Sequence, residues 1–466
     1  MLDLKGRKVI VVGLAKSGIG AADLLVKQGA LVTVFDTKDE AVLADNIKML
    51  ASSVALRASA KPEEKDLEEA DLLVLSPAVP ADLPFVLEAK RVGLPVWSEI
   101  ELASRFTKAK MIGITGTNGK TTTTSLVGEI MKKVDHQSMT AGNIGISMAE
   151  TVQTVPDHSF LTLELSSFQL ELIDQFHPIV SAILNFTPDH LNRHHTFEAY
   201  VEAKCRVYEN QTKEDTVILN YDDAICREKG LLLSKRENGP RVVFFSRKEK
   251  TPSGIWLEDG FIKAEKDGQI LDIVNVDEMK IFGPHNEENA MAAVGCCLYA
   301  GADIRYIQEG LREFPGVAHR IEPVGVIDGV SYYNDSKATN PDAAIKGLLA
   351  MRSPMTVLIG GGYDKGTPYD EWTDLFPGRV RKLVLIGQTA ETIREAAVRS
   401  GYPEEDIVFC ETFDEAIKCC RKAAVPGDSV LLSPACASWG MFDNYEQRGD
   451  IFRETVRKMK GETNAE

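Results

Sequence analysis

The chain has 466 residues, 44% of them hydrophobic and 26% charged, which is the composition of a globular protein long enough for about three domains. Its formal net charge is −16, from 53 basic and 69 acidic side chains, and no long basic run offsets this charge. A surface for nucleic acid or for an anionic membrane is therefore not expected.

Two further features of the composition bear on location. No apolar stretch is long enough to span a membrane, and the N-terminal segment lacks the apolar core and the cleavage site of a signal peptide. The eight cysteines include no Cys-x-x-Cys, so they predict neither a zinc site nor a disulfide framework. We expect buried free thiols in a protein of the cytoplasm.

Short runs of apolar, β-branched residues alternate with helical patterns, which predicts α/β architecture with parallel sheets covered by helices. In the first block we expect a helix that ends near residue 28, and strands at 8–13, 31–36, 72–76 and 95–97. The run Gly13-Leu-Ala-Lys-Ser-Gly18 follows the first strand and predicts a phosphate-binding loop. Position 15 is Ala where a dinucleotide-binding loop has Gly, so the loop does not clearly indicate NAD.

The second block opens with an apolar run at 110–112 and the loop Gly113-Ile-Thr-Gly-Thr-Asn-Gly-Lys-Thr-Thr122, followed by a helical pattern. A strand, a glycine loop and a helix in this order predict a P-loop, whose backbone amides and helix N-terminus hold phosphate. Lys120 would reach the outer phosphates, and the Thr121 hydroxyl would ligate magnesium. Position 114 is Ile where the strict motif has its first Gly.

The rest of the chain continues the α/β pattern. In the second block we expect strands at 160–164, 180–185 and 216–220, a β-meander over 241–282 with turns at 253–254, 259–260 and 267–268, and a helix over 286–299. In the third block we expect strands at 356–359, 383–386 and 429–432. Domain boundaries are expected near 98–108 and 315–320.

Each of three side chains of the second block has both a functional and a structural interpretation. Glu164 ends an apolar strand, where carboxylates face the ligand crevice, so it predicts either a magnesium ligand or a half-buried partner of a Lys. His190 follows another strand end and could ligate a metal, although a lone loop His is usually a surface group. Lys204 lies in a helical stretch and by itself indicates only a solvated helix lysine.

Two polar loops follow strands of the third block. The segment Tyr333-Asn-Asp-Ser-Lys-Ala-Thr-Asn-Pro341 contains an acid, a base and two hydroxyls, and Gly360-Gly-Gly-Tyr-Asp-Lys365 contains glycines and a cation. Each alone is a turn rich in turn-forming residues. Their shared position at strand ends favours a ligand site.

Seven motifs occur in one order along nearly the whole chain. They are Thr115-Gly-Thr-Asn-Gly-Lys-Thr121, Ala141-Gly-Asn-Ile-Gly145, Glu164-Leu-Ser-Ser-Phe-Gln169, Pro188-Asp-His-Leu191, Gly283-Pro-His-Asn-Glu-Glu-Asn-Ala290, His319-Arg320 and Asn334-Asp-Ser-Lys-Ala-Thr-Asn-Pro341. Together they resemble the Mur ligase family, the ATP-dependent amide-forming enzymes of peptidoglycan precursor synthesis. The resemblance implies an N-terminal Rossmann-like domain for a UDP-substrate (1–98), a central P-loop ATPase-like domain (99–317) and a C-terminal Rossmann-like domain for an amino acid (318–466).

Within the family the chain resembles the branch that adds D-glutamate to UDP-N-acetylmuramoyl-L-alanine. The first loop with Asp36-Thr37 and Ser76-Pro77, and the C-terminal segments 432–438 and 444–449, carry that resemblance, while Lys38 stands where the branch has Arg. It implies that ATP phosphorylates the substrate carboxylate and that the amine of D-glutamate attacks the acyl phosphate. It also implies small molecules as the partners of a monomer.

The resemblance implies a role for each matching residue. ATP would contact Gly116, Thr117, Asn118, Gly119, Lys120, Thr121, Thr122, Asn286, Asn289, Arg320 and Asp335, and two Mg²⁺ ions would be held by Thr121, Glu164, His190 and Lys204. Lys120, His190, Lys204 and Lys337 would be catalytic, and Lys204 would carry a carbamate made from CO₂, which requires a neutral amine. The UDP-substrate would contact Lys16, Ser17, Asp36, Thr37, Ser76 and Asn143, and D-glutamate would contact Thr339, Lys365, Ser438 and Tyr445.

Three other functions stay open on the sequence alone. A sister Mur ligase or a folylpolyglutamate synthase-like ligase would share the central motifs but use a different acceptor, which a substrate panel separates. A dehydrogenase built on the first block would bind NAD(H), against which Ala15 argues. A P-loop regulator without ligase chemistry would tolerate the loss of Lys204.

Overall fold

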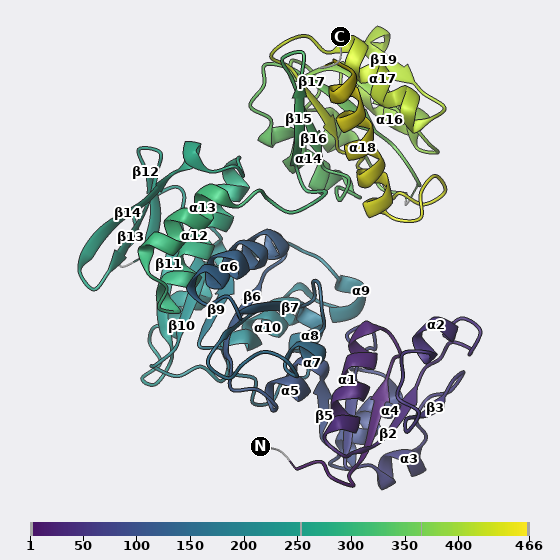
Figure 1. The fold of residues 1–466 in the computed structure, drawn as a ribbon, viewed down its shortest axis with the longest axis vertical. Coiled ribbons are helices and arrows are strands. Elements are labelled where there is room, and N and C mark those ends of the chain that lie inside the picture. Colours follow the sequence, from purple (N-terminus) through teal and green to yellow (C-terminus); the bar gives the residue numbers. More distant parts are fainter. Residues whose placement is uncertain (1–2, 252–253, 365, 464–466) are drawn as a thin grey trace. The chain divides into compact units, whose positions relative to one another are not determined.

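The computed structural model describes residues 3–251, 254–364 and 366–463. The chain divides into two compact units, residues 1–279 with 286–314, and residues 280–285 with 315–466. The first unit holds two sheets and the second unit holds a third (Figure 1). The α/β architecture of three sheet-based parts is as expected, whereas boundaries after residues 98 and 317 remain a proposal.

The first sheet has five parallel strands in the order β3-β2-β1-β4-β5, which is Rossmann-like. Its strands are β1 (Lys8–Val12), β2 (Leu31–Phe35), β3 (Ala55–Arg57), β4 (Leu72–Leu75) and β5 (Val96–Ser98). Its helices are α1 (Lys16–Lys27), α2 (Ala44–Ile47), α3 (Glu64–Glu69) and α4 (Pro84–Arg91). β4 is wholly buried, as a strand covered on both faces must be. The short edge strand β3 was not expected.

The second sheet has nine strands in the order β14-β13-β12-β11-β10-β9-β6-β8-β7. The strands are β6 (Lys110–Thr115), β7 (Met139–Gly142), β8 (Phe160–Glu164), β9 (Val180–Ile183), β10 (Thr216–Asn220), β11 (Arg241–Ser246), β12 (Ile255–Glu258), β13 (Phe261–Lys266) and β14 (Gln269–Asn275). β6 pairs in parallel with β8 and β9, so the C-terminal ends of these three strands meet at one edge.

Helices surround the second sheet (Figure 1). They are α5 (Glu99–Ser104), α6 (Lys120–Val134), α7 (Met148–Thr151), α8 (Ser167–Leu170), α9 (Leu191–His194), α10 (Phe197–Cys205), α11 (Ala224–Leu233), α12 (Pro284–Tyr299) and α13 (Ile304–Glu313), with 3-10 turns η1 (Arg206–Tyr208) and η2 (Val276–Glu278). α6 packs against β8 and α13. α12 is polar in its first two turns, whereas residues 290–298 are all buried and apolar on every side of the helix.

The β-meander expected over residues 241–282 is correct only in its second half. β12, β13 and β14 are antiparallel, and their turns at Asp259-Gly260 and Asp267-Gly268 have positive φ at both residues, as two-residue hairpins require. β11 instead pairs in parallel with β10 and β12. The connection from β10 to β11 is a crossover because it contains α11. The expected turn at 253–254 falls partly outside the described residues.

The second unit has a six-stranded sheet in the order β15-β16-β20-β17-β18-β19. Its strands are β15 (Glu322–Ile327), β16 (Val330–Asn334), β17 (Thr356–Gly360), β18 (Val380–Leu385), β19 (Ile407–Phe409) and β20 (Ser429–Leu432). Its helices are α14 (Pro341–Ala350), α15 (Asp370–Thr373), α16 (Ala390–Arg399), α17 (Phe413–Ala423) and α18 (Tyr445–Thr463), with the 3-10 turn η3 (Glu404–Asp406). The pairing of β15 with β16 is antiparallel and the others are parallel.

β18 begins at Val380, earlier than the expected start at residue 383. Arg381 and Lys382 precede the apolar run, and each pairs with a carboxylate, Asp428 at 2.6 Å and Asp406 at 2.8 Å. Paired charges can lie in a strand, but an apolar-run criterion does not detect them.

The two sheets of the first unit are held together by contacts between their loops and helices. Arg193 on α9 donates to the carbonyl oxygen of Val79, which follows β4, at 3.0 Å. α1 packs closely on α7, since a Cβ on Gly20 would lie 2.4 Å from Ser147 Oγ. The loops that follow β1 and β7 therefore lie side by side.

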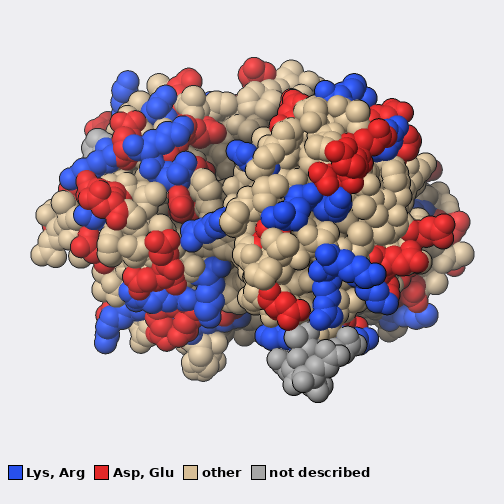
Figure 2. Space-filling model, turned by 90° about the horizontal axis from the view of Figure 1, so that it is seen from above, with Lys and Arg blue, Asp and Glu red and all other residues tan. Residues whose placement is uncertain are grey.

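The surface and the cysteines carry few special features. In the face drawn in Figure 2, basic and acidic side chains are interspersed, which is the pattern of an ordinary solvated surface. All eight cysteines are free thiols, as expected, and six are buried. Among the described helices, none combines the length and apolarity that a membrane crossing requires.

Candidate active site

The glycine loop at residues 116–119 connects β6 to α6, which begins at Lys120. Gly116 and Gly119 have φ of 144° and 84°, which residues with side chains rarely adopt. The Lys120 ammonium donates to the carbonyl oxygens of Gly116 at 3.0 Å and Thr117 at 2.8 Å. The N-terminus of α6 and this ammonium therefore provide positive charge at one short loop, the arrangement that binds phosphate.

Two residues absent from our sequence-based site, Asn185 and Tyr200, hold this loop in place. Asn185, just after β9, accepts the Asn118 N–H at 2.8 Å and donates from Nδ2 to the Asn118 carbonyl at 3.2 Å. The buried Tyr200 hydroxyl lies 2.9 Å from Thr117 Oγ1. The position of Asn185 at a strand end was an available signal, whereas nothing in the sequence distinguished Tyr200 from a core aromatic residue.

Two asparagines of α12, both expected at the nucleotide, lie against the same loop. Asn289 accepts the Thr123 hydroxyl at 3.2 Å and donates to Asn286 Oδ1 at 3.2 Å. A Cβ on Gly119 would lie only 2.2 Å from Asn289 Oδ1. The loop therefore has no space for a side chain at residue 119.

Gly119→Ala is expected to weaken ATP binding by at least about tenfold, because the added methyl group strains the backbone and displaces Asn289. Gly268→Ala is the matched control, since Gly268 has a φ of 77° and no atom within 4 Å of an added Cβ. Calorimetric titration of both variants with ATP and magnesium makes the comparison. Equal affinities would show that the shape of the loop does not govern nucleotide binding.

Glu164 ends β8 beside the glycine loop and is only 2% exposed. Its Oε1 accepts the Asn143 side-chain amide at 2.8 Å, whereas its buried Oε2 has no hydrogen-bond partner among the described residues. A buried carboxylate oxygen without a partner is unfavourable unless a cation meets it. The side chain therefore fits Mg²⁺, which commonly takes one or two carboxylates and completes its shell with phosphate and water oxygens.

The other groups for a metal come from the first turn of α6. Thr121 is half-buried there, and Thr122 is buried. In the described ranges, no three His, Cys, Asp or Glu side chains gather as a metal site. Magnesium binding would therefore depend on Glu164, on the Thr121 hydroxyl and on oxygens of the bound phosphate.

Lys204 lies near the end of α10 and is 2% exposed, so its interpretation as a solvated helix lysine is wrong. Its Nζ lies 4.7 Å from the centre of the Tyr200 ring. Burial, and secondly the charge of Lys120, lower the pKa of this ammonium well below its usual range, while Asp189 and Glu164 act in the opposite direction. The environment thus favours the neutral amine.

His190 precedes α9 with a left-handed φ of 53° and an exposed side chain. Its ring lies 4.9 Å from that of Phe168, and its Nε2 is 3.6 Å from Asp189 Oδ2. The nearby His194 is different, because it is buried and bonds to Ser167 Oγ at 2.9 Å. Burial lowers the pKa of His194 to about 4, so it is a neutral structural group and His190 is the accessible imidazole.

In the first sheet, Asp36 and Ser76 shape the loop after β1. Asp36 accepts the N–H groups of Leu14 at 2.7 Å and Lys38 at 2.9 Å, and the Ser76 hydroxyl donates to the Gly13 carbonyl at 2.8 Å. Both of these predicted ligand residues therefore form hydrogen bonds with backbone groups of the loop. They define its form whether or not they also contact a ligand.

The remaining residues expected at the UDP-substrate lie around the same loop. Lys16, the first residue of α1, donates from its ammonium to the carbonyl oxygen of Gly145, in the loop that carries Asn143. Ser17 is half-buried and Thr37 is exposed. The contact between Lys16 and Gly145 thus brings the loop after β1 next to the loop that carries Asn143, and Asn143 in turn is hydrogen-bonded to Glu164.

In the second unit, Asp335 follows β16 and is buried. Its carboxylate accepts the Ser433 hydroxyl at 2.8 Å and the Ile321 N–H at 3.2 Å. Burial is the main reason that its pKa is raised to about 7, and these two hydrogen bonds and the charge of Arg320 only partly oppose the increase.

The raised pKa of Asp335 predicts a pH-dependent stability. The folded state holds the Asp335 proton more tightly than the unfolded state does. The stabilisation of the fold by this proton is therefore full below about pH 4 and is lost as the pH rises toward 7. Asp335→Asn removes it, so the stability of the variant relative to wild type should rise by about 2–3 kcal/mol from pH 5 to pH 8, at about 1.4 kcal/mol for each of two pH units. Urea unfolding at both pH values measures this difference. A constant difference between the proteins would contradict the assignment.

Arg320 lies in a strained segment. His319 and Ile321, on either side, have φ of 62° and 44°, which is rare for a β-branched residue such as Ile321. Arg320 Nε is buried and lacks a hydrogen-bond partner in the part of the chain that the structure describes. Backbone strain and an unsatisfied donor at one position are typical of a ligand-binding site.

Lys337 and Tyr445 lie together near this segment. The Lys337 ammonium lies 5.6 Å from the centre of the Tyr445 ring, and the Lys337 N–H donates to the His319 carbonyl at 2.9 Å. Sequence reasoning missed the residue that supports them, Arg448. Its fully buried guanidinium donates to the Ser336 carbonyl at 2.7 Å and hydroxyl at 2.9 Å. Its place in the 444–449 motif was the available signal.

The glycines after β17 allow a close approach of two loops. A Cβ on Gly361 would lie 2.1 Å from the Ile386 carbonyl, and one on Gly362 would lie 2.4 Å from the Ala437 carbonyl. The segment beyond β20 thus contacts this loop and leads directly to the buried Ser438. Thr339 is half-buried in the loop before α14. Lys365, expected at D-glutamate, lies outside the described residues.

Three family models match successive parts of the chain: "Mur ligase MurD-like, N-terminal domain" over residues 7–98, "Mur ligase middle domain" over 114–297 and "Mur ligase, glutamate ligase domain" over 319–436. With a P-loop, a buried carboxylate beside it and these matches, the chain belongs to the Mur ligase family. It is an ATP-dependent ligase that forms an amide bond and releases ADP.

Curated relatives give a narrower comparison. The chain is 47% identical over 458 residues to the UDP-N-acetylmuramoylalanine–D-glutamate ligase of Lachnospira eligens, with 98% of this chain and all of that protein covered. The proteins of the same name from Thermoanaerobacter sp. and Clostridioides difficile are 45% and 44% identical, each over 460 residues, with the same coverage.

Solved structures with lower identity share the fold. The MurC ligase of Thermotoga maritima matches with a TM-score of 0.58 and 20% identity over 97% of this chain and all of that chain. MurF of Acinetobacter baumannii matches with a TM-score of 0.60 and 16% identity over 93% of this chain and 86% of that chain. These matches support the fold and do not bear on the substrate.

Proposed function

We propose that this chain joins D-glutamate to the carboxyl group of UDP-N-acetylmuramoyl-L-alanine, with ATP converted to ADP and phosphate, as a step of peptidoglycan precursor synthesis. The relatives named for this reaction match 98% of the chain, which supports the choice of substrate. The observation that carries the chemistry is the convergence of Lys120, the uncommitted oxygen of Glu164 and the buried Lys204 around one glycine loop.

The reaction has two steps whose needs these residues meet. A carboxylate is a poor electrophile, so its oxygen first attacks the γ-phosphorus of ATP, which gives an acyl phosphate and ADP. The amine of D-glutamate then attacks the acyl carbon, phosphate leaves, and the amine loses a proton. Positive groups must offset the charge that builds up on phosphate oxygens. Lys120 and the amides of α6 would do so, and we propose the same role for Arg320 and Lys337.

Magnesium, when bound, would neutralise phosphate charge and help to align the reacting groups. We propose Thr121 and Glu164 for one ion and His190 and Lys204 for another. For the second role Lys204 would react with CO₂ to form a carbamate and release a proton, which turns an amine into an oxygen ligand. The burial that lowers the Lys204 pKa supports this, because only the neutral amine reacts.

The residues proposed to contact the two substrates are those that the family resemblance implies. Lys16, Ser17, Asp36, Thr37, Ser76 and Asn143 are proposed for the UDP-substrate, and Thr339, Lys365, Ser438 and Tyr445 for D-glutamate. The domain boundaries after residues 98 and 317, a monomeric state and a cytoplasmic location are proposals as well. Light scattering after size-exclusion chromatography and cell fractionation test the last two.

The test of the function is an amino-acid panel with phosphate release as the readout. Release should require UDP-N-acetylmuramoyl-L-alanine and D-glutamate together. Release with L-alanine, with a diamino acid or with a folate acceptor in place of these would assign the chain to another ligase. The alternative to this proposal is a sister Mur ligase or a folylpolyglutamate synthase-like ligase with a different acceptor, and the match of residues 319–436 to a glutamate ligase domain supports glutamate as the amino acid.

A further inference from the structure

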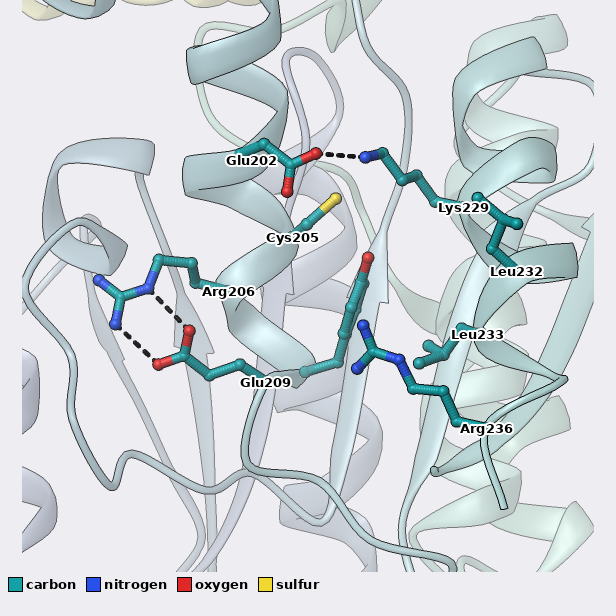
Figure 3. A pocket seen from close by; sticks show the side chains of 9 residues that line it. Glu202, Cys205, Arg206, Glu209, Lys229, Leu232, Leu233 and Arg236 are labelled. Carbon is teal, nitrogen blue, oxygen red and sulfur yellow. Dashed lines mark hydrogen bonds and ion pairs between the residues drawn. The ribbon is translucent and has the colours of Figure 1, made fainter. Parts of the chain in front are cut away.

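A cavity of about 310 Å³ lies in the first unit between α10 with η1 on one side and α11 on the other (Figure 3). This volume lies in the range of pockets that hold small organic ligands. The cavity is lined by side chains of two kinds, apolar groups that include Leu232 and Leu233, and charged groups that include Lys229 and Arg236. None of these residues belongs to the candidate active site.

The charges of the cavity do not cancel. Arg206 pairs with Glu209 at 2.7 Å and 2.8 Å, and Lys229 donates to Glu202. Among the described residues, the Arg236 guanidinium has no hydrogen-bond or ion-pair partner. Three cations face two carboxylates, which leaves a charge of +1 in a chain whose net charge is −16. A local excess of positive charge in an acidic protein favours an anionic ligand.

Neutral polar groups lie beside Arg236. The Cys205 thiol is hydrogen-bonded to Tyr208, and the charge of Arg236 acts on both groups. Figure 3 shows Cys205 and Arg236 facing the same space, with Leu233 next to Arg236. Within the described part of the chain, the cavity therefore offers one cation without an ion-pair partner, neutral hydrogen-bonding groups and an apolar wall.

We propose that this cavity is an effector site for a small organic anion, a molecule with one carboxylate or phosphate on a short apolar body. Arg236 pairs with the anionic group, and Leu232 and Leu233 contact the apolar body. α10 connects the cavity to the active site, since Cys205 lines the cavity and the preceding residue, Lys204, is buried within the electrostatic reach of Lys120 and Glu164. A ligand that shifts this turn of α10 changes the position of Lys204.

Calorimetric titration of the full chain with benzoate or phenyl phosphate tests the binding, with saturating magnesium and ADP present to fill the phosphate loop. Arg236→Gln should weaken binding of either probe by at least about tenfold. Lys235→Gln, which removes the same charge from an exposed neighbour that does not line the cavity, should leave it unchanged. Comparison of the two probes distinguishes a carboxylate from a phosphate ligand, and inorganic phosphate alone should bind more weakly than phenyl phosphate.

The proposed connection between the cavity and the active site is tested by measuring the ligation rate. At a saturating probe, the ligation rate of the wild type should change by at least about twofold, and that of Arg236→Gln should not. Absence of binding, or equal weakening by Arg236→Gln and Lys235→Gln, would overturn the site. Binding that depends on Arg236 but leaves the wild-type rate unchanged would overturn the connection through α10.

Discussion

Lys204→Met and Lys204→Ala are expected to lower kcat for ligation by at least about a thousandfold while ATP still binds. Lys204 is buried beside Lys120 and Glu164, so its loss removes the proposed carbamate ligand without touching the phosphate loop itself. The Met variant keeps most of the side-chain volume and removes a buried amine whose charged form is disfavoured by burial, so it should be at least as stable as the wild type. Steady-state kinetics, ATP titration and thermal unfolding give the three measurements.

Lys213→Met is the control for this experiment, because Lys213 is a surface lysine with 71% side-chain exposure. It should leave all three measurements unchanged. The carbamate has a direct signature, a carbon-13 resonance that appears when the wild type is equilibrated with labelled bicarbonate and is absent from Lys204→Met. Wild-type turnover in Lys204→Met would rule out any metal-binding role for this residue.

Glu164→Gln is expected to reduce kcat by about 10²–10³-fold and to raise the magnesium concentration that half-saturates the reaction. The substitution is isosteric and keeps the contact with Asn143, so the loss reports the charge of the carboxylate rather than its shape. The substitution also replaces a buried carboxylate charge, whose Oε2 has no hydrogen-bond partner among the described residues, by a neutral amide, which should stabilise the ligand-free protein by about 1–3 kcal/mol. An active-site residue that opposes stability is a common compromise between function and folding.

Titration of the activity with magnesium tests the expected loss of activity in Glu164→Gln. Urea unfolding without ligand tests the expected gain in stability. Glu198→Gln provides the matched control, since Glu198 is an exposed residue in the first turn of α10. If Glu164→Gln were as active as the wild type at limiting magnesium, Glu164 would not be a metal ligand. A variant that lost both activity and stability would instead indicate a structural carboxylate.

Local patterns in the sequence gave the elements of the core. Continuous apolar runs predicted β1, β4, β6 and β8, because strands covered on both faces can carry few polar residues. The glycine loop at 116–119 was predicted for a similar reason, since its backbone conformation needs glycine at two positions. The sequence did not predict segments whose polar residues depend on a distant partner, such as the first residues of β18, where Arg381 pairs with Asp428.

The candidate site divides in the same way. Residues in motifs, such as Lys120 and Glu164, were found because their residue type and their place at a strand end carry the signal. Tyr200 and Arg448 were missed, because their roles arise from contacts with Thr117 and Ser336 that lie far away in the sequence.

By itself, the sequence determined most of the α/β elements of the core, the phosphate loop and, through its motifs, the kinship with Mur ligases. These are properties of neighbouring residues and of residue types, so they can be read without a fold. Only the tertiary structure decided that Lys204 is buried, that one oxygen of Glu164 has no hydrogen-bond partner among the described residues and that Arg236 faces a cavity. Burial and the pairing of charges depend on which distant segments surround a side chain, and that depends on how the sheets and helices assemble.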